Sequence, residues 1–500
     1  MLILSSIAIQ PELYSNDKVT TNGKAICIIG AGPVGLAALK VLLDSSQYRS
    51  GEWKTTVFEA RDELGGVWLP APIPPTGEPP ESSIYASLTT NIPHPVMAYT
   101  SYPFAPSTAL FPDAKVVLKY LNDYADHFHL RPHIQFKTTV KKVVWNASRW
   151  EVTTSANTVL SFDLVMVCNG HYRIPRYPDT PGMTQWLSSG RASHSATYRH
   201  PYDMGDTVLV VGGGPSGQDI SAEMCTTART VIHSVTSATA EDIGNLKRRG
   251  RVTHFGDNGR VTFENGSVET GIDHCILATG YEYSFPFFSE DVLRSAVPSP
   301  VPPLPSELYN STYGVFPLAR HLFPLTKTFP SSNLAFLGLL IHVAPFPLVE
   351  AQARAVLHAF ANPEDLEPMQ EAVDIMTRYE ELRKKVSDDP RSIAKAWHHF
   401  ETLEQFEYRD ALYKFCVASD GDLNAAWLSA QNERSARVPE WEKEMYCKKI
   451  LLRKAWKRVE ELGKAEEWVK GIGQGGVHEW VNMTKRLEKW YEIEETKSKL

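Results

Sequence analysis

Short, unbroken runs of apolar residues, each followed at once by glycine, mark two places in the first half of the chain. Residues 25–29 read AICII and lead into Gly30, and the LAALKVLL that follows repeats its apolar positions with helical spacing. Residues 207–211 read TVLVV, lead into Gly212 and are again followed by a helical segment. Apolar runs without polar alternation are typical of strands buried in a parallel sheet. The pattern therefore predicts two strand–turn–helix units and an α/β fold.

Both predicted turns have the spacing G-x-G-x-x-G, formed by Gly30, Gly32 and Gly35 and by Gly212, Gly214 and Gly217. The first glycine of such a turn permits a tight bend, the second lets the backbone approach a pyrophosphate, and the third lets helix and strand pack closely. The helix N-terminus presents free N–H groups and a positive dipole to the anion. One match is weak, but two in the same context predict two Rossmann-like dinucleotide-binding domains.

The residue that ends the second strand of each unit distinguishes the two sites. The strand TTVFEA ends at Glu59, where a carboxylate binds a ribose hydroxyl and disfavours a 2′-phosphate. The corresponding strand RTVIHSVT, residues 229–236, ends without an acidic residue. We therefore expect FAD or NAD at the first turn. The contrast with the second predicts FAD first and a nicotinamide cofactor second.

Further patterns predict how the chain is divided. A helix is expected over residues 114–127, strands within 135–170, a hairpin at Asn265-Gly266, and a strand followed by a long helix within 333–361. Proline-rich connectors follow the two predicted sheets, and residues 69–80 form a proline-rich surface loop. The second domain is thus expected to be inserted in the first. The expected parts are a tail (1–23), an FAD domain (24–174 and 285–361), an NADPH domain (175–284) and a helical extension (362–500).

The C-terminal part changes to charged, amphipathic helices rich in tryptophan. Charges spaced along such helices indicate a solvated face. We expect an appendage that packs on the rest of the chain, with a partner-binding surface as the alternative.

Composition narrows the class of protein. The chain has 43% hydrophobic and 22% charged residues, as ordinary globular proteins do, and a net charge of −7 gives no support for nucleic-acid binding. The six cysteines are scattered without a C-x-x-C pair, so neither a zinc site nor a redox dithiol is expected. No apolar run is long enough for a transmembrane segment. These features predict a cytoplasmic enzyme without a metal that acts on a small molecule and is free to form a homo-oligomer.

The motifs, taken in order, resemble the flavin-containing monooxygenases, and the fungal branch most closely. The matching stretches are GAGPVG (30–35), FEARDELGGVW (58–68), LTTNIP (88–93), CNGHYRIPRYP (168–178), VLVVGGGPSGQDI (208–220), ILATGY (276–281) and PFPLVEAQAR (345–354). The resemblance implies that NADPH reduces FAD and that O2 forms a C4a-hydroperoxyflavin. This species then passes one oxygen atom to a soft nitrogen or sulfur nucleophile.

The resemblance also implies site residues. Asn91 corresponds to an asparagine beside the flavin where oxygen reacts, although by itself an asparagine before a turn is most often a local hydrogen-bonding device. Cofactor contacts are implied for Asn91 itself and for Ala31, Pro33, Val34, Gly66, Val67, Trp68, Thr90, Pro215, Ser216, Gln218, Asp219, Thr279, Gly280 and Gln352. These positions add to the six turn glycines and to Glu59.

Two departures from the family pattern leave alternatives open. In the signature F-x-G-x-x-x-H-x-x-x-Y/F, Gly190, His194 and Tyr198 match, but Ser188 replaces phenylalanine. Tyr198, where tryptophan would indicate a Baeyer–Villiger enzyme, favours the flavin-containing monooxygenases. The arginine that often grips the 2′-phosphate is missing after residue 234, so either NADPH preference is relaxed or another cation replaces it, from Arg229, Lys247, Arg248 and Arg249.

The remaining alternatives are a Baeyer–Villiger or N-hydroxylating monooxygenase, and a redox sensor or NADPH oxidase without productive oxygenation. A flavin disulfide reductase is disfavoured because it needs a dithiol near the flavin.

Overall fold

The first sheet of the computed structural model has five parallel strands in the order β24-β7-β1-β2-β3. The structure describes residues 23–417 and 437–498, so the predicted tail lies almost wholly outside it. The strands β1, β2, β3 and β7 come from residues 24–167, whereas β24, which joins the sheet beside β7, comes from residues 334–336. Their bounds are β1 (Lys24–Ile29), β2 (Trp53–Phe58), β3 (Ile134–Gln135), β7 (Leu164–Val167) and β24 (Leu334–Phe336).

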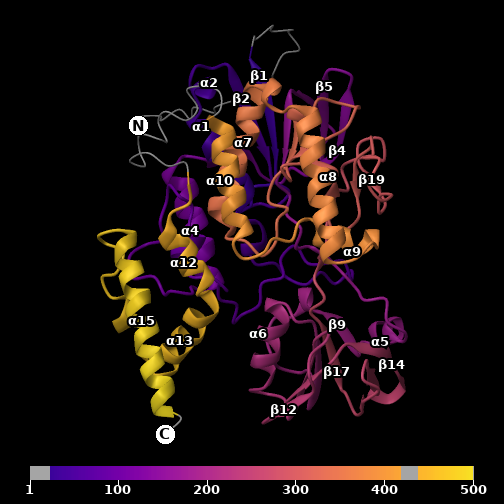
Figure 1. Ribbon diagram of the computed structural model, residues 1–500, viewed down its shortest axis with the longest axis vertical. Helices are drawn as coiled ribbons and strands as arrows, with labels where there is room; N and C mark the ends of the chain where they lie inside the picture. Colours follow the sequence, from indigo (N-terminus) through magenta and orange to yellow (C-terminus); the bar gives the residue numbers. More distant parts are fainter. Residues whose placement is uncertain (1–22, 418–436, 499–500) are drawn as a thin grey trace, which may run out of the picture.

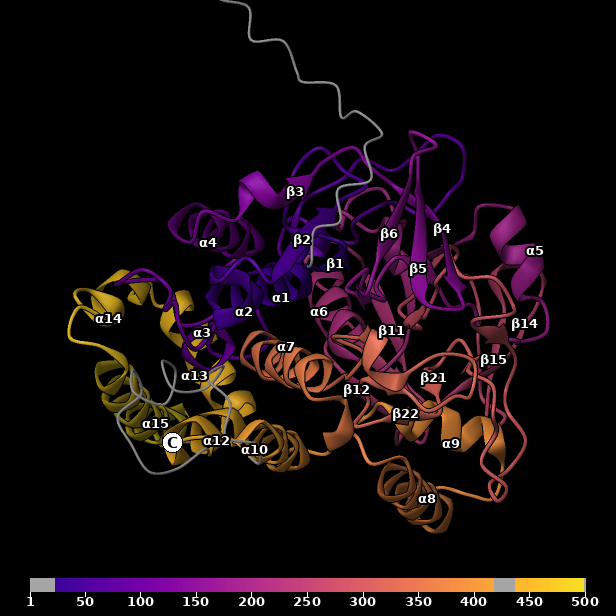
Figure 2. The ribbon, with the colours of Figure 1, turned by 90° about the horizontal axis from the view of Figure 1, so that it is seen from above.

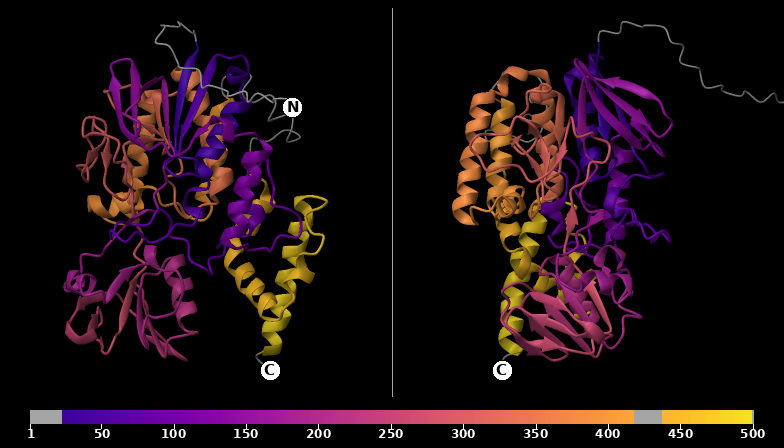
Figure 3. Two further views of the ribbon diagram at one scale, coloured as in Figure 1. Left: turned by 180° about the vertical axis from the view of Figure 1, so that it is seen from behind. Right: turned by 90° about the vertical axis from the view of Figure 1, so that its right-hand side faces the viewer.

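Alternate residues of β1 explain how both faces of this sheet are covered. Ile26 and Ile28 face the core that contains α1 (Pro33–Asp44) and α7 (Pro345–Ala361), which pack side by side (Figure 2). Cys27 and Ile29 face a second core with an antiparallel sheet on the opposite side (Figure 3). That sheet consists of β4 (Val140–Asn146), β5 (Arg149–Thr154) and β6 (Val159–Phe162).

The second sheet has six strands in the order β12-β13-β11-β10-β17-β9, all parallel except β12. Helix α6 (Pro215–Met224) covers one face, and α5 (Met183–Ser188) with a three-stranded sheet covers the other. The six strands are β9 (Ala192–His194), β10 (Thr207–Val211), β11 (Thr230–Ser234), β12 (Glu241–Ile243), β13 (Leu246–Arg249) and β17 (His274–Leu277). The small sheet contains β14 (Val252–Phe255), β15 (Val261–Phe263) and β16 (Val268–Glu269).

Two connections link the sheets, and they pair with each other. Strand β8 (Ile174–Pro175) leads out of the first sheet and lies antiparallel to β18 (Tyr281–Glu282), which leads back. Arg176 fastens this ribbon through hydrogen bonds to the carbonyl oxygens of Tyr281 and Thr312. Figure 1 shows the two sheets at opposite ends of the molecule with these connections between them.

Helices form the C-terminal part, as predicted. Helices α8 (Pro368–Lys385), α9 (Pro390–Trp397) and α10 (Glu404–Val417) lie on the α7 side of the first sheet (Figure 3). Helices α12 (Glu440–Cys447), α13 (Lys449–Glu461), α14 (Ala465–Val469) and α15 (Val477–Ser498) form an arm beside both sheets (Figure 1). A buried ion pair between Arg409 and Glu442 joins α10 to this arm. None of the helices in the described ranges is both long and apolar enough to cross a membrane.

Several local predictions are confirmed. Helix α4 (Ala114–His127) has the predicted bounds, and Asp113 caps it by accepting a hydrogen bond from the N–H of Val116. The hairpin at Asn265-Gly266 joins β15 to β16. The remaining elements are α2 (Ser46–Arg49), α3 (His94–Met97), β19 (Arg294–Ser295), β20 (Tyr309–Asn310), β21 (Val315–Phe316), β22 (Leu318–Ala319), β23 (Phe323–Pro324) and 3₁₀ turns at Gly66–Trp68, Arg131–His133, Ser195–Thr197, Asp257–Gly259, Ser331–Asn333 and Pro363–Asp365.

Candidate functional site

The first glycine turn leaves no room for side chains. The N–H of Gly30 donates to the carbonyl of Phe58 at 2.8 Å, and its φ of +103° is one that other residues rarely adopt. A Cβ on Gly30 would lie 2.7 Å from the carbonyl oxygen of Cys168, and one on Gly35 would lie 1.9 Å from that of Gly30. Gly30 and Gly35 therefore perform the bend and the close packing that their spacing predicted.

A second glycine pair covers this turn. The N–H of Gly65 donates to the carbonyl of Ala31 at 3.1 Å, and a Cβ on Gly66 would lie 2.9 Å from the Cα of Gly32. Gly66, Val67 and Trp68 form a 3₁₀ turn at this place. The predicted contact segment thus lies directly against the first glycine turn.

Arg61 holds that covering loop in place, a role that was not predicted from the sequence. Its guanidinium donates hydrogen bonds to the carbonyl oxygens of Gly66 (3.1 Å), Leu69 (2.7 Å) and Pro70 (2.8 Å). A loop rich in glycine and proline needs hydrogen-bond donors for its carbonyl groups. That need was the one sequence feature that could have indicated a role for Arg61.

Glu59 lies at the carboxyl end of β2, and its carboxylate holds the turn. Its two oxygens accept the N–H groups of Ala31 at 2.7 Å and Arg61 at 2.9 Å. Burial raises the pKa of Glu59, and the two backbone hydrogen bonds oppose that shift. Since each carboxylate oxygen has two acceptor sites, Glu59 keeps the capacity to accept a ribose hydroxyl.

Asn91 lies on a segment that is anchored to the same turn. Thr90 and Ile92 are buried, and the Thr90 hydroxyl donates to the Ile92 carbonyl at 2.9 Å, which leaves Asn91 exposed between them. Farther along, Tyr99 donates from its hydroxyl to the carbonyl of Pro33 at 2.6 Å. The Asn91 segment therefore adjoins the start of α1, although no hydrogen bond joins Asn91 itself to the described residues of the turn.

Gln352 supports the turn from α7. Its Oε1 accepts the N–H of Gly338 at 2.9 Å, and its Nε2 donates to the Tyr408 hydroxyl at 3.1 Å. A Cβ on Gly338 would lie 2.7 Å from Cγ2 of Val34. Both ends of the Gln352 amide are thus engaged by the protein, and its visible role is to hold Gly338 against the first turn of α1.

The helices that follow both glycine turns have free N-terminal N–H groups. No side chain caps α1 at Gly32 or α6 at Gly214, and neither helix has an acidic residue in its first turn. Side chains cap α4, α8 and α9, from Asp113, Glu367 and Asp389, whereas α7, α12 and α13 lack such caps as α1 and α6 do. Uncapped N–H groups behind a glycine turn fit a bound pyrophosphate.

The second turn repeats the backbone of the first but is open. The N–H of Gly212 donates to the carbonyl of Ser234 at 2.9 Å, and a Cβ on Gly217 would lie 2.0 Å from the carbonyl oxygen of Gly212. Around a Cβ on Gly214, however, no atom lies within 4 Å. Gly214 and Pro215 are exposed, and Ser216 is half-buried.

The polar residues after this turn bind other parts of the chain. Gln218 donates through Nε2 to the carbonyl of Gly213 at 3.0 Å. Asp219 forms an ion pair with Arg453 of α13 at 2.9 Å, so the C-terminal arm reaches the second unit. On the neighbouring strand end, Thr279 donates to the Arg176 carbonyl at 2.6 Å, and Gly280 accepts the Arg176 N–H at 2.9 Å.

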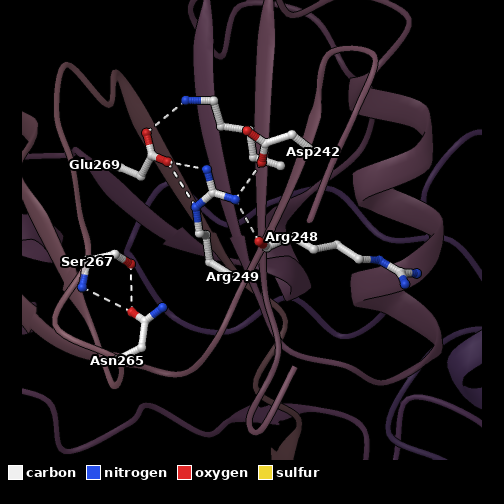
Figure 4. Close-up of polar contacts among 7 residues, drawn as sticks. Asp242, Arg248, Arg249, Asn265, Ser267 and Glu269 are labelled. Atoms are coloured by element: carbon white, nitrogen blue, oxygen red, sulfur yellow. Dashed lines mark hydrogen bonds and ion pairs between the residues drawn. The ribbon is translucent and has the colours of Figure 1, made fainter. Parts of the chain in front are cut away.

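The cations expected to replace a phosphate-binding arginine lie in different places. Arg229 precedes β11 and pairs with Asp206, so it lies at the opposite end of the strand from the expected ribose. The prediction that Arg229 takes the place of the phosphate-binding arginine is therefore wrong. Arg249 is held between Glu269 and Asp242, and Lys247 also donates to Glu269 (Figure 4). Arg248 is exposed and points away from that cluster (Figure 4).

The matched signature residues serve the second unit internally. Tyr198 donates from its hydroxyl to Glu223 at 2.7 Å, and Nδ1 of His194 accepts the N–H of Ala196 at 3.1 Å. Burial lowers the pKa of His194 to about 4, so its ring is neutral at physiological pH. His194 therefore acts as a local cap and not as an acid.

In the part of the chain that the structure describes, the first turn has neither a metal-ligand cluster nor a reactive thiol. Within residues 23–417 and 437–498, no cluster of three or more His, Cys, Asp or Glu side chains could hold a metal ion. Cys168 is buried at the turn, and burial raises the pKa of its thiol, which keeps it unreactive.

The comparisons with known proteins agree with this geometry. A family model described as flavin-binding monooxygenase-like matches residues 23–241 and 239–408. Flavin-containing monooxygenase FMO GS-OX-like 7 of Arabidopsis thaliana is 31% identical over 462 residues, covering 86% of this chain and 88% of that protein. FMO GS-OX-like 4 of the same plant is 29% identical over 454 residues, covering 84% and 90%.

Among solved structures, S-allyl-L-cysteine S-oxygenase from Allium sativum is similar with a TM-score of 0.71 and 25% identity, covering 93% of this chain and 99% of that one. The matches confirm the α/β fold and the predicted enzyme class, a flavin monooxygenase that uses FAD and NADPH. They do not test the fungal branch, which stays a prediction. The chain belongs to the flavin-binding monooxygenase-like family.

Proposed function

We propose that the first glycine turn binds FAD, that the second binds NADPH, and that the enzyme oxygenates a soft sulfur or nitrogen nucleophile. The observation that carries this assignment is the difference in cover between the turns. Ala31 and Gly32 are buried beneath the Gly66 loop, whereas Gly214 and Pro215 are exposed. A covered site suits a cofactor that remains through many turnovers, and an open site suits one that exchanges in each.

When bound, FAD supplies the reaction with O2, and NADPH supplies the reducing equivalents. The chain supplies binding and position. The uncapped N-termini of α1 and α6 bind the pyrophosphates, and Glu59 accepts from the FAD ribose. Arg61 holds the Gly66 loop over the first turn and so excludes water from it.

Asn91 is the proposed catalytic residue. Its amide donates and accepts hydrogen bonds but does not titrate, so it would bind an oxygen species without delivering a proton to it. The buried Thr90 and Ile92 on either side fix the backbone that presents Asn91 outward. The other cofactor contacts, from Ala31 to Gln352, are proposed because the family resemblance implies them.

The proposed domains follow the expected bounds, with FAD at 24–174 and 285–361 and NADPH at 175–284. Both boundaries fall at or next to the β8–β18 ribbon, which supports them. Residues 362–500 are proposed as a packing extension, supported by the contacts of Arg409 and Arg453. A cytoplasmic location and association with further copies stay predictions.

We propose a thioether as the first substrate to test, because the Allium sativum neighbour is named as an S-oxygenase and covers nearly the whole chain. Purified protein should be yellow, NADPH should bleach it and air should restore the colour. A panel of S-allyl-L-cysteine, N,N-dimethylaniline and cyclohexanone separates sulfur, nitrogen and Baeyer–Villiger oxygenation. Stoichiometric peroxide release with all three would contradict oxygenation and favour an NADPH oxidase.

The Asn91→Ala variant tests the catalytic assignment. We expect full FAD content and an unchanged rate of reduction by NADPH, with most of the reducing equivalents released as peroxide instead of product. Removal of one preorganised hydrogen-bond donor of this kind changes rates by about 10²–10³-fold. Thr89→Ala, one residue before Thr90 in the same segment, is the control and should stay coupled. Unchanged coupling in Asn91→Ala would reduce Asn91 to a structural role.

A further inference from the structure

The loop after β11 marks where the second nucleotide places its adenine ribose. Ser234 is the partner of Val211 in the sheet, as Phe58 is the partner of Ile29 in the first unit. Val235 therefore occupies the position of Glu59. A Cβ on Gly213 would lie 2.8 Å from Cγ1 of Val235, so an apolar side chain fills the space that the Glu59 carboxylate takes in the first unit.

A carboxylate nevertheless reaches this loop from another element. Glu264 follows β15, and its Oε1 accepts the N–H of Ser237 at 2.9 Å and the N–H of Arg251 at 2.9 Å. Hydrogen bonds from these two backbone groups lower the pKa of Glu264, so it is charged at neutral pH. An oxyanion thus already binds one N–H group of the loop, that of Ser237, two residues beyond Val235 and the expected ribose position.

The cations at this edge of the sheet are already neutralised. Arg249, whose side chain is only 12% exposed, donates to Glu269 at 2.6 and 2.9 Å and to Asp242 at 2.6 Å. Figure 4 shows its guanidinium enclosed between these two carboxylates. Arg251 lies 3.7 Å from Glu264. A 2′-phosphate that enters here meets a bound carboxylate and few unpaired positive charges.

We propose that Glu264 is a specificity-determining residue that occupies the place of the cofactor's 2′-phosphate and so weakens the preference for NADPH over NADH. The inference rests on the proposed nicotinamide site at the second turn. NADPH binds after Glu264 leaves the N–H of Ser237, whereas NADH binds with Glu264 in place. A phosphate that competes with the Glu264 carboxylate for the N–H of Ser237 is repelled by it, and this repulsion weakens binding of the phosphorylated cofactor alone.

Binding of 2′,5′-ADP and 5′-AMP to the FAD-loaded full chain tests the proposal by calorimetry, without turnover. In Glu264→Gln, 2′,5′-ADP should bind about ten-fold more tightly, as loss of one like-charge contact predicts. The affinity for 5′-AMP should not change. Asp206→Asn, which removes an exposed charge at the other end of the same sheet, is the matched control and should change neither affinity.

A second pair of variants guards against a local folding effect. Glu264→Ala should show the same selective gain, and Glu269→Gln, which removes one of the two carboxylates that bind Arg249, should also favour 2′,5′-ADP. An unchanged ratio of the two affinities in both Glu264 variants would overturn the proposal while leaving the nicotinamide site intact. Failure of the wild-type chain to bind either nucleotide would remove the site itself, and the proposal with it.

Discussion

The two glycine turns have the same backbone course but lie in different surroundings. Each first glycine donates to the end of the neighbouring strand, and each third glycine packs against the carbonyl of the first. The first turn is buried beneath Gly66, while a Cβ on Gly214 of the second would meet no atom within 4 Å. One backbone motif is therefore covered in the first unit and open in the second, and the difference is made by other parts of the chain.

The side chains beyond each second strand extend the contrast. In the first unit Glu59 binds the turn at the N–H of Ala31, and in the second Val235 packs against Gly213. A carboxylate suits a ribose with a free hydroxyl, whereas an apolar residue neither binds nor repels a phosphate. The anion at the second site comes instead from Glu264, which reaches the loop from a hairpin.

The largest expected effect comes from adding one methyl group to each turn. In Gly35→Ala the new Cβ would lie 1.9 Å from a backbone oxygen, so we expect loss of bound FAD and destabilisation by about 3 kcal/mol. In Gly214→Ala the Cβ meets nothing and φ is −73°, so fold and FAD content should be kept while NADPH binding weakens. Absorbance at the flavin band measures FAD content, urea unfolding measures the free energy of unfolding, and titration with NADPH measures its affinity. A stable, yellow Gly35→Ala protein would break the comparison.

A smaller effect is expected from Glu59→Gln. The Gln amide offers one acceptor oxygen where two N–H groups now bind, so the affinity for FAD should fall by about 1–3 kcal/mol. Because burial raises the pKa of Glu59, the wild-type chain should also lose FAD affinity as pH falls through that raised value, and the variant should not. Glu52→Gln, at the exposed start of the same strand, is the control. Equal pH profiles for wild type and Glu59→Gln would contradict this role.

Local patterns predicted the backbone of the fold well. The bounds of α4 and the glycine turns were predictable because helix caps, apolar runs and glycine spacing act over a few residues. Glu59 was predictable because an acidic residue at the end of the second strand, about 20 residues beyond the last glycine, is part of the motif. Contacts between distant segments were not predictable in this way. Asp219 pairs with Arg453, 234 positions away, and the local sequence around either residue does not predict the other as its partner.

The prediction of the site was limited because the sequence does not show which side chains pair with one another. Arg249 has the charge that a phosphate needs, but Glu269 and Asp242 already bind it, and the sequence does not show that pairing. Arg229 is close to β11 in sequence but precedes the strand, so it lies at the wrong end. The roles of Asn91 and the other site residues stay predictions.

The smallest expected effect comes from breaking the ion pair that joins the second unit to the C-terminal arm. Helix α1 packs on α7 within its own unit, whereas α6 is tied to the C-terminal arm by Asp219 and Arg453. In Arg453→Met this ion pair is lost, and amide hydrogen exchange in α6 should become about five-fold faster. That change corresponds to about 1 kcal/mol less free energy of local opening. FAD content and exchange in α1 should not change.

Arg458→Met on the same helix removes only an exposed pair with Glu461 and serves as its control. If both variants gave the same exchange in α6, the arm would be a passive appendage. If only Arg453→Met changed it, the open turn would owe part of its rigidity to a segment far along the chain, whereas the covered turn is held by Arg61 and Gln352. The extension would then act on the exchanging nucleotide alone, because the ion pair contacts α6 and leaves α1 untouched.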